Sequence, residues 1–452
     1  MATLRSTLNL PEAIGLSMAI TSPTVTAAFN ITMVVGAAGA AAPLAFAVGM
    51  AAMLLVAVAF IAFARRIAHA GSAYAYIAHT FGKRAGFIAG CMLLLTYLGF
   101  TTGFGALVGS FTAAALKDMG FAAERWWLAI GAGSMFLAAW LAYRDMRLSG
   151  RLMLALEGIA VLGILALCVR ILHRTHPGLD QVLASIHPVS AFGGWTGFGF
   201  AMVFSILSYG GFEGAATLGE ETHNPRRNIP IALFSTVAGC GVFFIFISYC
   251  EVVGFAPVGL KALADSQAPL NDLALRYASP RLAIALDLFA AISCFSGALG
   301  GISAVGRMLF ALGRAGLSRR LAEVHPTLGT PARAVLLASA SVIVPYLLLA
   351  PFAGAGNYYS YTATIGALAL ILVYIGVSSA EVVEALRGRK HAWAAACGLA
   401  TALLLWVLYR NVYPVPDYPN DLWPYFTLAW VVGAWGIMRL RPAVTAPLPE
   451  LM

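Results

Sequence analysis

The chain has 452 residues, of which 60% are hydrophobic and only 10% are charged. Soluble globular domains carry about a quarter charged residues, so this composition excludes a soluble protein and indicates one that lies in a membrane. The formal net charge of +9 is interpreted as a sign of membrane topology, because the basic residues gather between apolar runs. We therefore expect no nucleic-acid partner.

Apolar runs recur along the whole chain, each near the roughly 20 residues that a helix needs to cross about 30 Å of hydrocarbon. Strands of a membrane barrel would be about ten residues long and would alternate polar with apolar side chains. The predicted fold class is therefore an all-α polytopic membrane protein with about twelve transmembrane helices. In chain order these spans cover residues 12–36, 43–64, 85–116, 126–143, 151–172, 197–219, 229–254, 281–312, 333–350, 358–379, 392–409 and 423–438.

The first span is expected to remain in the mature protein, because the polar stretch before it holds a single Arg5 and no small-residue cleavage pattern follows. Lys and Arg concentrate in alternate loops, as they do on the cytoplasmic side of membrane proteins. The basic pairs at 65–66, 83–84 and 226–227 fall on one side if the N-terminus is cytoplasmic. We predict a multi-pass protein of the cell (cytoplasmic) membrane, with both termini in the cytoplasm and the lipid bilayer around it.

Cysteine and histidine give no sign of a cofactor. The six cysteines lie within or at the edge of apolar spans, without a CxxC pair or a His–Cys cluster, so neither a disulfide framework nor a metal site is expected. The eight histidines fall mostly in loops, where solvated or interfacial side chains are the usual interpretation. We expect no metal and no cofactor.

Two spans are interrupted near their middles. The triplet 22–24 (SPT) interrupts the first span, and Gly210, Gly211 and Gly214 interrupt the sixth. The breaks are five spans apart, so equivalent helices would run in opposite directions, as an inverted five-plus-five repeat requires. We predict a single transporter domain over 1–452, with a first repeat at 12–172, a second at 197–379 and two additional helices at 392–438.

A broken membrane helix exposes backbone polar groups that cost several kcal/mol each unless protein, water or a ligand satisfies them. Half-helix N-termini suit a carboxylate, whereas C-terminal ends and unwound carbonyls suit an ammonium group or a cation. The alternative is that these glycines only kink or pack helices. Packing is the interpretation that we adopt for the glycines of the third span, which are Gly99, Gly103, Gly105 and Gly109.

Three segments carry a family resemblance. They are GFEGAATLGEETHNPRRNIPIAL at 211–233, GSAYAYIAHTFGKRAGFIAG at 71–90, and GRMLFALGRAGLSRRLAEVHPTLGTP at 306–331. The first resembles the sixth helix, and the turn after it, of the amino acid–polyamine–organocation (APC) family of secondary transporters, and the others resemble two cytoplasmic stretches of that family. Ala315 and Ser318 stand where that family usually has Asp and Pro.

The resemblance implies a substrate site between the unwound parts of helices 1 and 6, flanked by helices 3, 8 and 10, in an alternating-access cycle. Aromatic residues beside the double glycine would cover the substrate, although packing alone would also account for them. The candidate substrate-binding residues are Thr21, Ser22, Pro23, Thr24, Tyr97, Thr101, Tyr209, Gly210, Gly211 and Phe212.

The first helix departs from the family pattern. Members that carry α-amino acids usually have a Gly-Ser-Gly-like triplet whose N–H groups hold the substrate carboxylate, whereas this chain has Ser22, Pro23 and Thr24. Proline has no N–H, so one donor is missing. An ordinary α-amino acid remains a candidate through the hydroxyl groups of Thr21, Ser22 and Thr24, and an amine, or an acid with its head group placed differently, becomes a stronger candidate than is usual.

Glu213 is the predicted proton-coupling residue, because a carboxylate at mid-membrane must be protonated or paired and is a default functional candidate. The alternative is that it only ties helix 6 to neighbouring backbone groups. Glu157 and Asp287 are interpreted as interhelical hydrogen-bond partners or as residues near the membrane surface. Glu251, near the outer end of its span, is predicted to be wetted.

The coupling ion is predicted to be H⁺, with Na⁺ as the alternative. Sodium-driven transporters of this fold use oxygen ligands from helices 1 and 8, and Ser293 with Ser296 forms a candidate cation site here. Some sodium-independent relatives place a lysine from helix 5 there, and the fifth span has no lysine within it.

The sequence predicts a secondary active transporter of an amino acid or related small amine, with symport and exchange both open and without enzymatic activity. A membrane-embedded enzyme would need a Ser–His pair, HExxH or paired aspartates, and no such pattern occurs. A non-transporting sensor or receptor would normally carry a soluble output domain. The expected partner is a small-molecule substrate, and the sequence does not indicate an oligomeric state.

Overall fold

The computed structural model describes residues 9–66, 72–144, 150–188, 192, 194–217, 222–314, 316–325, 331–416 and 418–440. The described chain is built from helices and contains no β-strand. Within the described residues each of the twelve predicted spans lies mostly on helix, so the all-α fold class is confirmed. In the segment 211–233, whose sequence resembles the family's sixth helix and the following turn, residues 218–221 lie outside the described part, as does Ala315.

The bounds of the helices are as follows. The first half consists of α1 (Leu10–Thr21), α2 (Pro23–Val25), η1 (Thr26–Asn30), α3 (Ile31–Ala38), η2 (Gly39–Ala41), α4 (Ala42–Arg66), α5 (Ser72–Phe81), α6 (Lys83–Asp118), η3 (Glu124–Trp126), α7 (Trp127–Tyr143), α8 (Gly150–Thr175) and α9 (Leu179–Ile186). The second half consists of α10 (Gly194–Ser208), α11 (Gly214–Thr217), α12 (Pro225–Phe255), α13 (Leu260–Ala264), α14 (Pro269–Tyr277), α15 (Pro280–Arg314), α16 (Ala332–Ala353), α17 (Ala355–Arg387), α18 (His391–Arg410) and α19 (Leu422–Leu440).

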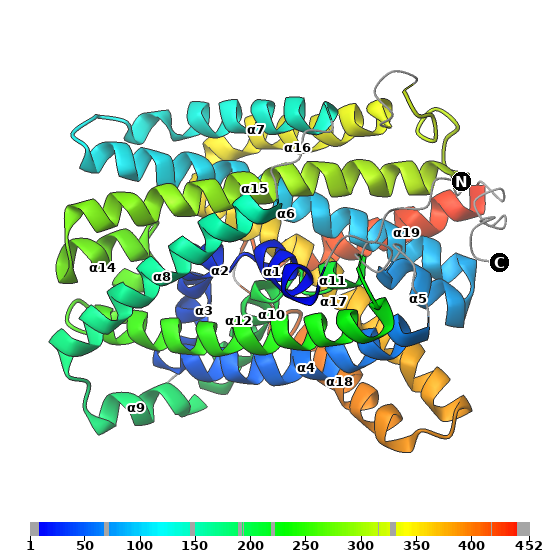
Figure 1. Ribbon diagram of the computed structural model, residues 1–452, viewed down its shortest axis with the longest axis horizontal. Coiled ribbons are helices and arrows are strands. Elements are labelled where there is room, and N and C mark those ends of the chain that lie inside the picture. Colours follow the sequence, from blue (N-terminus) through cyan, green and yellow to red (C-terminus); the bar gives the residue numbers. More distant parts are fainter. Residues whose placement is uncertain are drawn as a thin grey trace.

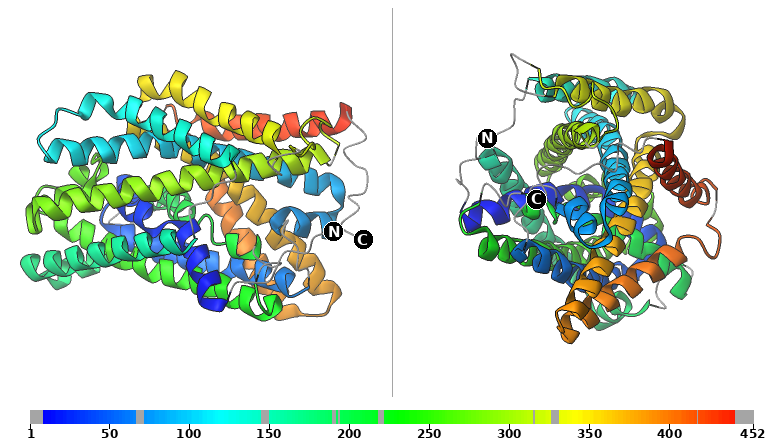
Figure 2. Two further views of the ribbon diagram at one scale, coloured as in Figure 1. Left: turned by 45° about the horizontal axis from the view of Figure 1, so that its top comes forward. Right: turned by 90° about the vertical axis from the view of Figure 1, so that its right-hand side faces the viewer.

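Most of the long helices run along the longest axis of the molecule, and Figure 2 shows the bundle also from one end. Within the described residues, nine helical stretches are long and apolar enough to cross a membrane. Two breaks partly explain why this number is below twelve. After the break in the first span, the rest of that span and the second span form one continuous stretch, Pro23–Arg66. The break in the sixth span divides it into helices that are too short to cross a membrane. The protein is therefore a multi-pass membrane protein.

Two helices form the centre of the bundle. In the most apolar stretch of α6, 78% of the residues are buried, and in that of α17, 72%, whereas the figures for α7, α8 and α18 are below 30%. A helix that is apolar on all sides and buried on all sides belongs to the interior, and one that exposes apolar side chains here faces lipid. The exposed side chains of Leu162, Phe352 and Trp406 therefore lie where they would contact lipid.

The contact between α6 and α17 depends on glycine. A Cβ atom at Gly99 would come within 2.5 Å of the Thr362 carbonyl oxygen, and one at Gly103 within 2.8 Å of the Tyr359 ring. On the opposite side of α6, a Cβ at Gly109 would collide with the Trp127 carbonyl at the start of α7. The prediction that the glycines of this span serve close packing is confirmed.

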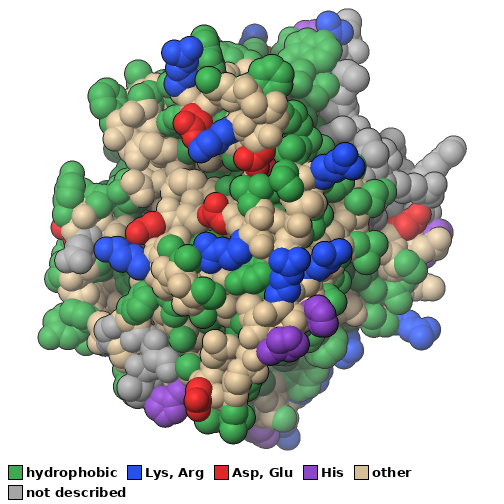
Figure 3. All heavy atoms as spheres, turned by 90° about the vertical axis from the view of Figure 1, so that its left-hand side faces the viewer, with side chains coloured by type: hydrophobic (Ala, Val, Ile, Leu, Met, Phe, Trp, Pro, Cys, Tyr) green, Lys and Arg blue, Asp and Glu red, His purple; other side chains and the backbone are tan. Residues whose placement is uncertain are grey.

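The two ends of the bundle differ. The short α5 lies at the right-hand end in Figure 1, and α9 and α14 lie at the left-hand end. At the α5 end, the Arg66 guanidinium forms an ion pair with Glu381 at 2.8 Å, which joins α4 to α17. Figure 3 looks onto the opposite end, where basic, acidic and histidine side chains are mixed.

At this left-hand end, Asn271 of α14 donates both amide hydrogens, to Asp118 at 2.6 Å and to Asp287 at 2.7 Å. Asp287 therefore makes an interhelical hydrogen bond, as the sequence indicated.

The prediction that Glu251 is wetted was wrong, because its side chain is fully buried. The segments that separate the predicted spans at 172–196 and 255–280 contain the short helices α9, α13 and α14.

Candidate functional site

The break in helix 1 lies at Ser22. Pro23 cannot donate a backbone hydrogen bond, and its ring disfavours α-helical geometry in the residue before it. The α1 helix therefore ends at Thr21, and Ser22 adopts the left-handed conformation with φ 54° and ψ 69°. A non-glycine residue held there costs roughly 1–3 kcal/mol, so the surrounding contacts must maintain this conformation.

After the break the helix resumes in an unusual form. The α2 helix begins at Pro23 and passes into the π-helix η1 before α3 starts at Ile31. Asn30 at the end of η1 accepts a hydrogen bond from the Tyr359 hydroxyl of α17 at 2.9 Å. The π-helical turn is therefore fixed to one of the two central helices, and such turns are frequent at functional sites.

The break in helix 6 follows Ser208, the last residue of α10. Gly211 has φ 103°, a conformation that L side chains rarely adopt, so glycine is required at this position. The helix resumes as α11 at Gly214. The Ser17 hydroxyl of α1 donates to the Phe212 carbonyl at 3.1 Å, and this bond brings the break in helix 6 against helix 1.

Glu213 lies inside the helix 6 break and is 6% exposed. Its Oε2 accepts a hydrogen bond from the Tyr374 hydroxyl of α17 at 2.7 Å and one from the Gly211 N–H at 3.1 Å. The Tyr374 ring also packs on Phe212, with ring centroids 5.7 Å apart. The carboxylate is thus tied both to the unwound backbone and to α17.

Glu157 of α8 connects the break in helix 1 to α15. Its Oε1 accepts a hydrogen bond from the Thr24 N–H at 2.7 Å, and its Oε2 accepts one from the Ser293 hydroxyl at 2.9 Å. The Ser22 and Ser293 hydroxyl oxygens are 2.6 Å apart, and because Ser293 donates to Glu157, the Ser22 hydroxyl donates to Ser293. The sequence interpretation of Glu157 as an interhelical hydrogen-bond partner is confirmed.

The structure places four predicted site residues at the helix 1 break. Thr21, Ser22, Pro23 and Thr24 are all buried, and the Thr21 hydroxyl donates back to the Ser17 carbonyl at 3.0 Å. Ser293 of α15 is connected to these residues by its hydrogen bond with the Ser22 hydroxyl. Ser296, three residues further along α15, is as buried as Ser293.

The remaining predicted residues lie on α6 and in the helix 6 break. Thr101 of α6 is buried against Gly301 of α15, where a Cβ atom would collide with its hydroxyl. Tyr97, one turn earlier, is partly exposed and packs against the core. Phe212 is fully buried and meets Phe60 and Tyr374 edge-on or tilted.

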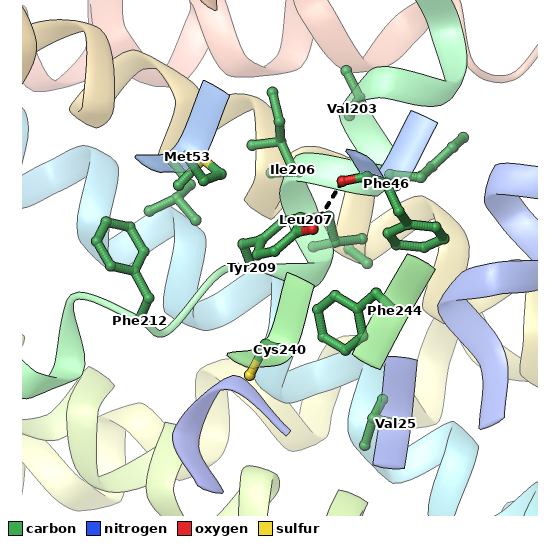
Figure 4. Packing of buried hydrophobic residues seen from close by; sticks show 14 of the residues in the cluster. Val25, Phe46, Met53, Val203, Ile206, Leu207, Tyr209, Phe212, Cys240 and Phe244 are labelled. Atoms are coloured by element: carbon green, nitrogen blue, oxygen red, sulfur yellow. Dashed lines mark hydrogen bonds between the residues drawn. The ribbon is translucent and has the colours of Figure 1, made fainter. Parts of the chain in front are cut away.

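Tyr209 favours the packing interpretation that the sequence left open. Its hydroxyl donates to the Phe46 carbonyl of α4 at 2.9 Å, and its ring lies edge-on to Phe244 of α12. Figure 4 shows this side chain directed into the apolar cluster. Gly210, next to it, is partly exposed and lies close to Leu370 and Phe100.

Sequence reasoning missed Tyr374 and Tyr359 as partners of Glu213 and Asn30. Both tyrosines belong to α17, and along the chain Tyr374 lies 161 residues from Glu213 and Tyr359 lies 329 residues from Asn30. A buried tyrosine needs a partner for its hydroxyl, and this requirement was the signal available. It does not identify the partner.

Comparisons of the chain with known proteins identify transport proteins. A family model described as "Amino acid permease" matches residues 12–434. The low-affinity putrescine importer PlaP of Escherichia coli (strain K12) is 25% identical over 350 residues, which are 75% of this chain and 74% of that protein. The branched-chain amino acid permease BcaP of Lactococcus lactis subsp. cremoris is 26% identical over 330 residues, which are 68% of this chain and 69% of that one.

Among solved structures, the manganese transporter of Eremococcus coleocola, crystallised with an aromatic bis-isothiourea substituted compound, has a similar fold. The TM-score is 0.56 at 12% identity, and the match covers 96% of this chain and 94% of the other. At this identity the likeness concerns the fold alone.

Proposed function

The chain belongs to the amino acid permease family, and on this premise we propose that it is a proton-coupled secondary active transporter of an amino acid or a related small amine. It would work by alternating access in the cytoplasmic membrane, with both termini facing the cytoplasm. The substrate range follows from two relatives, one a putrescine importer and one a branched-chain amino acid permease.

The observation that carries proton coupling is the position of Glu213. This carboxylate is nearly fully buried in the unwound part of helix 6, where its Oε2 accepts hydrogen bonds from Gly211 and Tyr374. A proton that binds to this oxygen competes with both bonds. Protonation would therefore change how the break in helix 6 is held to α17, and substrate binding at the same break would be linked to the proton.

The test is uptake by purified protein in proteoliposomes. We expect labelled putrescine or leucine to accumulate when the outside is more acidic than the inside, without sodium. Glu213→Gln should abolish this accumulation while sparing exchange of external for internal substrate, because exchange needs no net proton movement. Equal loss of accumulation and exchange would instead assign Glu213 a structural role.

A second candidate is sodium-coupled transport. The oxygen atoms of Ser22, Ser293 and Glu157 lie together beside the helix 1 break, and hard cations prefer such ligands. In the same proteoliposomes, accumulation driven by a sodium gradient at equal pH on both sides would favour this candidate. Accumulation driven by neither gradient, with exchange intact, would identify an exchanger.

A further inference from the structure

The N-terminus of the second half of helix 1 has no backbone N–H left for a ligand. The first N–H groups of a helix lack intrahelical partners and form a natural anion site. Here Pro23 has no N–H, and the Thr24 N–H donates to Glu157 at 2.7 Å. The N–H groups of Val25 and Thr26 both donate to the Ser22 carbonyl, at 3.1 and 3.3 Å.

The group that occupies this position is itself a carboxylate. Glu157 reaches the helix from α8, and its second oxygen is held by Ser293, which in turn accepts from Ser22. The chain of bonds from Ser22 through Ser293 and Glu157 to Thr24 spans the break. A substrate carboxylate at the same N-terminus would meet the negative charge of Glu157 and would find no free backbone N–H.

The other side of the break is suited to a positive charge. In a continuous helix the Ile20 carbonyl would accept from the Thr24 N–H, which here goes to Glu157, and the Ala19 carbonyl would accept from residue 23, which is proline. The C-terminal end of α1 therefore presents carbonyl oxygens, and such ends attract cations. Ser17 links this half-helix to the break that contains Glu213.

We propose that Glu157 is a specificity-determining residue, whose carboxylate takes the place of a substrate carboxylate at the helix 1 break. The site then accepts amines that lack an α-carboxylate and discriminates against the corresponding α-amino acids. This inference rests on the proposed function and narrows its substrate class.

The test compares ligands that differ only in the carboxylate. Purified protein is titrated with the pairs ornithine and putrescine, lysine and cadaverine, and leucine and isopentylamine, and dissociation constants are obtained from ligand-induced thermal stabilisation. The amine of at least one pair is expected to bind at least about tenfold more tightly than its amino acid, because like charges in a desolvated site disfavour the wrong ligand.

Two variants address the residue itself. Glu157→Ala removes the internal carboxylate and frees the Thr24 N–H, so the affinity ratio should shift toward the amino acid by about tenfold or more. Pro23→Gly adds an N–H at the same N-terminus and should shift the ratio in the same direction. Glu251→Gln alters another carboxylate, fully buried in α12, and should leave the ratio unchanged.

Each outcome decides between the proposals. If the wild type binds the amino acid of every pair as tightly as its amine or more tightly, or if neither Glu157→Ala nor Pro23→Gly changes the ratio, the assignment of Glu157 is overturned and the transporter proposal stands. If the wild type binds no member of any pair, the proposed function itself fails, and the inference fails with it. The ratio is measured within one protein, so a loss of stability in a variant does not imitate the expected result.

Discussion

At the scale of single residues, the sequence predicted the positions where the backbone breaks, but it did not predict the hydrogen-bond partners that come from distant parts of the chain. Pro23 and Gly211 interrupt helices for reasons that lie in their own backbones, and both breaks occur where predicted. The partners of Glu157 and Glu213 depend on which helix faces which. Helical periodicity predicts which face of a helix is buried, but it does not predict which other helix packs against that face.

The bond between Tyr374 and Glu213 leads to a prediction about stability. Tyr374→Phe removes a donor to a carboxylate, and hydrogen bonds to charged groups contribute about 1.5–3 kcal/mol. Tyr346→Phe is the matched control, because its hydroxyl donates to a neutral carbonyl, that of Leu128, at 3.1 Å. In detergent, the thermal midpoint should fall further for Tyr374→Phe. Equal falls would argue against an ionised Glu213 in this bond.

At the scale of helices, length and apolarity were enough to place the twelve predicted ranges on helical segments but not to find the short helices between them. The α9, α13 and α14 helices have eight, five and nine residues, too few to give a clear periodic signal. The glycines of α6 were the exception, since small residues at regular spacing predict close helix contacts. Their partners in α7 and α17 appear only in the structure.

The contact between α6 and α7 can be tested with a pair of glycine substitutions. Gly109→Ala places a methyl group against the Trp127 carbonyl, and such overpacking costs about 1–3 kcal/mol of stability. Gly133→Ala, on α7, meets nothing within 4 Å. The control should be neutral or slightly stabilising, because alanine favours helix. Thermal unfolding of both variants checks this order, and a Gly109 variant as stable as the wild type would contradict the tight contact.

At the scale of the whole molecule, the ion pair between Arg66 and Glu381 holds two helices together at the α5 end. The two partners are not equivalent, because the Arg66 side chain is 35% exposed and that of Glu381 is fully buried. A buried charge that loses its partner is far more costly than an exposed one, whose charge water can stabilise. The fold therefore depends on the arginine more than on the glutamate.

This asymmetry predicts different effects of the two single substitutions. Arg66→Met leaves Glu381 buried without its partner and should cost about 3–5 kcal/mol of stability. Glu381→Gln leaves Arg66 in contact with water and should cost less. Thermal midpoints at one pH measure both. If Glu381→Gln were the more damaging change, the pair would not be stabilised in the way described.

The π-helical turn at Thr26–Asn30 shifts the phase of the helix that follows it. A π turn contains one residue more than an α turn, so every side chain from Ile31 onward points about 100° away from the direction that an uninterrupted α-helix would give it. Conversion of this turn to ordinary α-helix without a deletion would redirect the whole apolar face of α3, whereas conversion together with the deletion of one residue would leave that face where it is. A relative with an ordinary α-helix here would align with this chain only through a one-residue gap, and residues compared without that gap would face different neighbours.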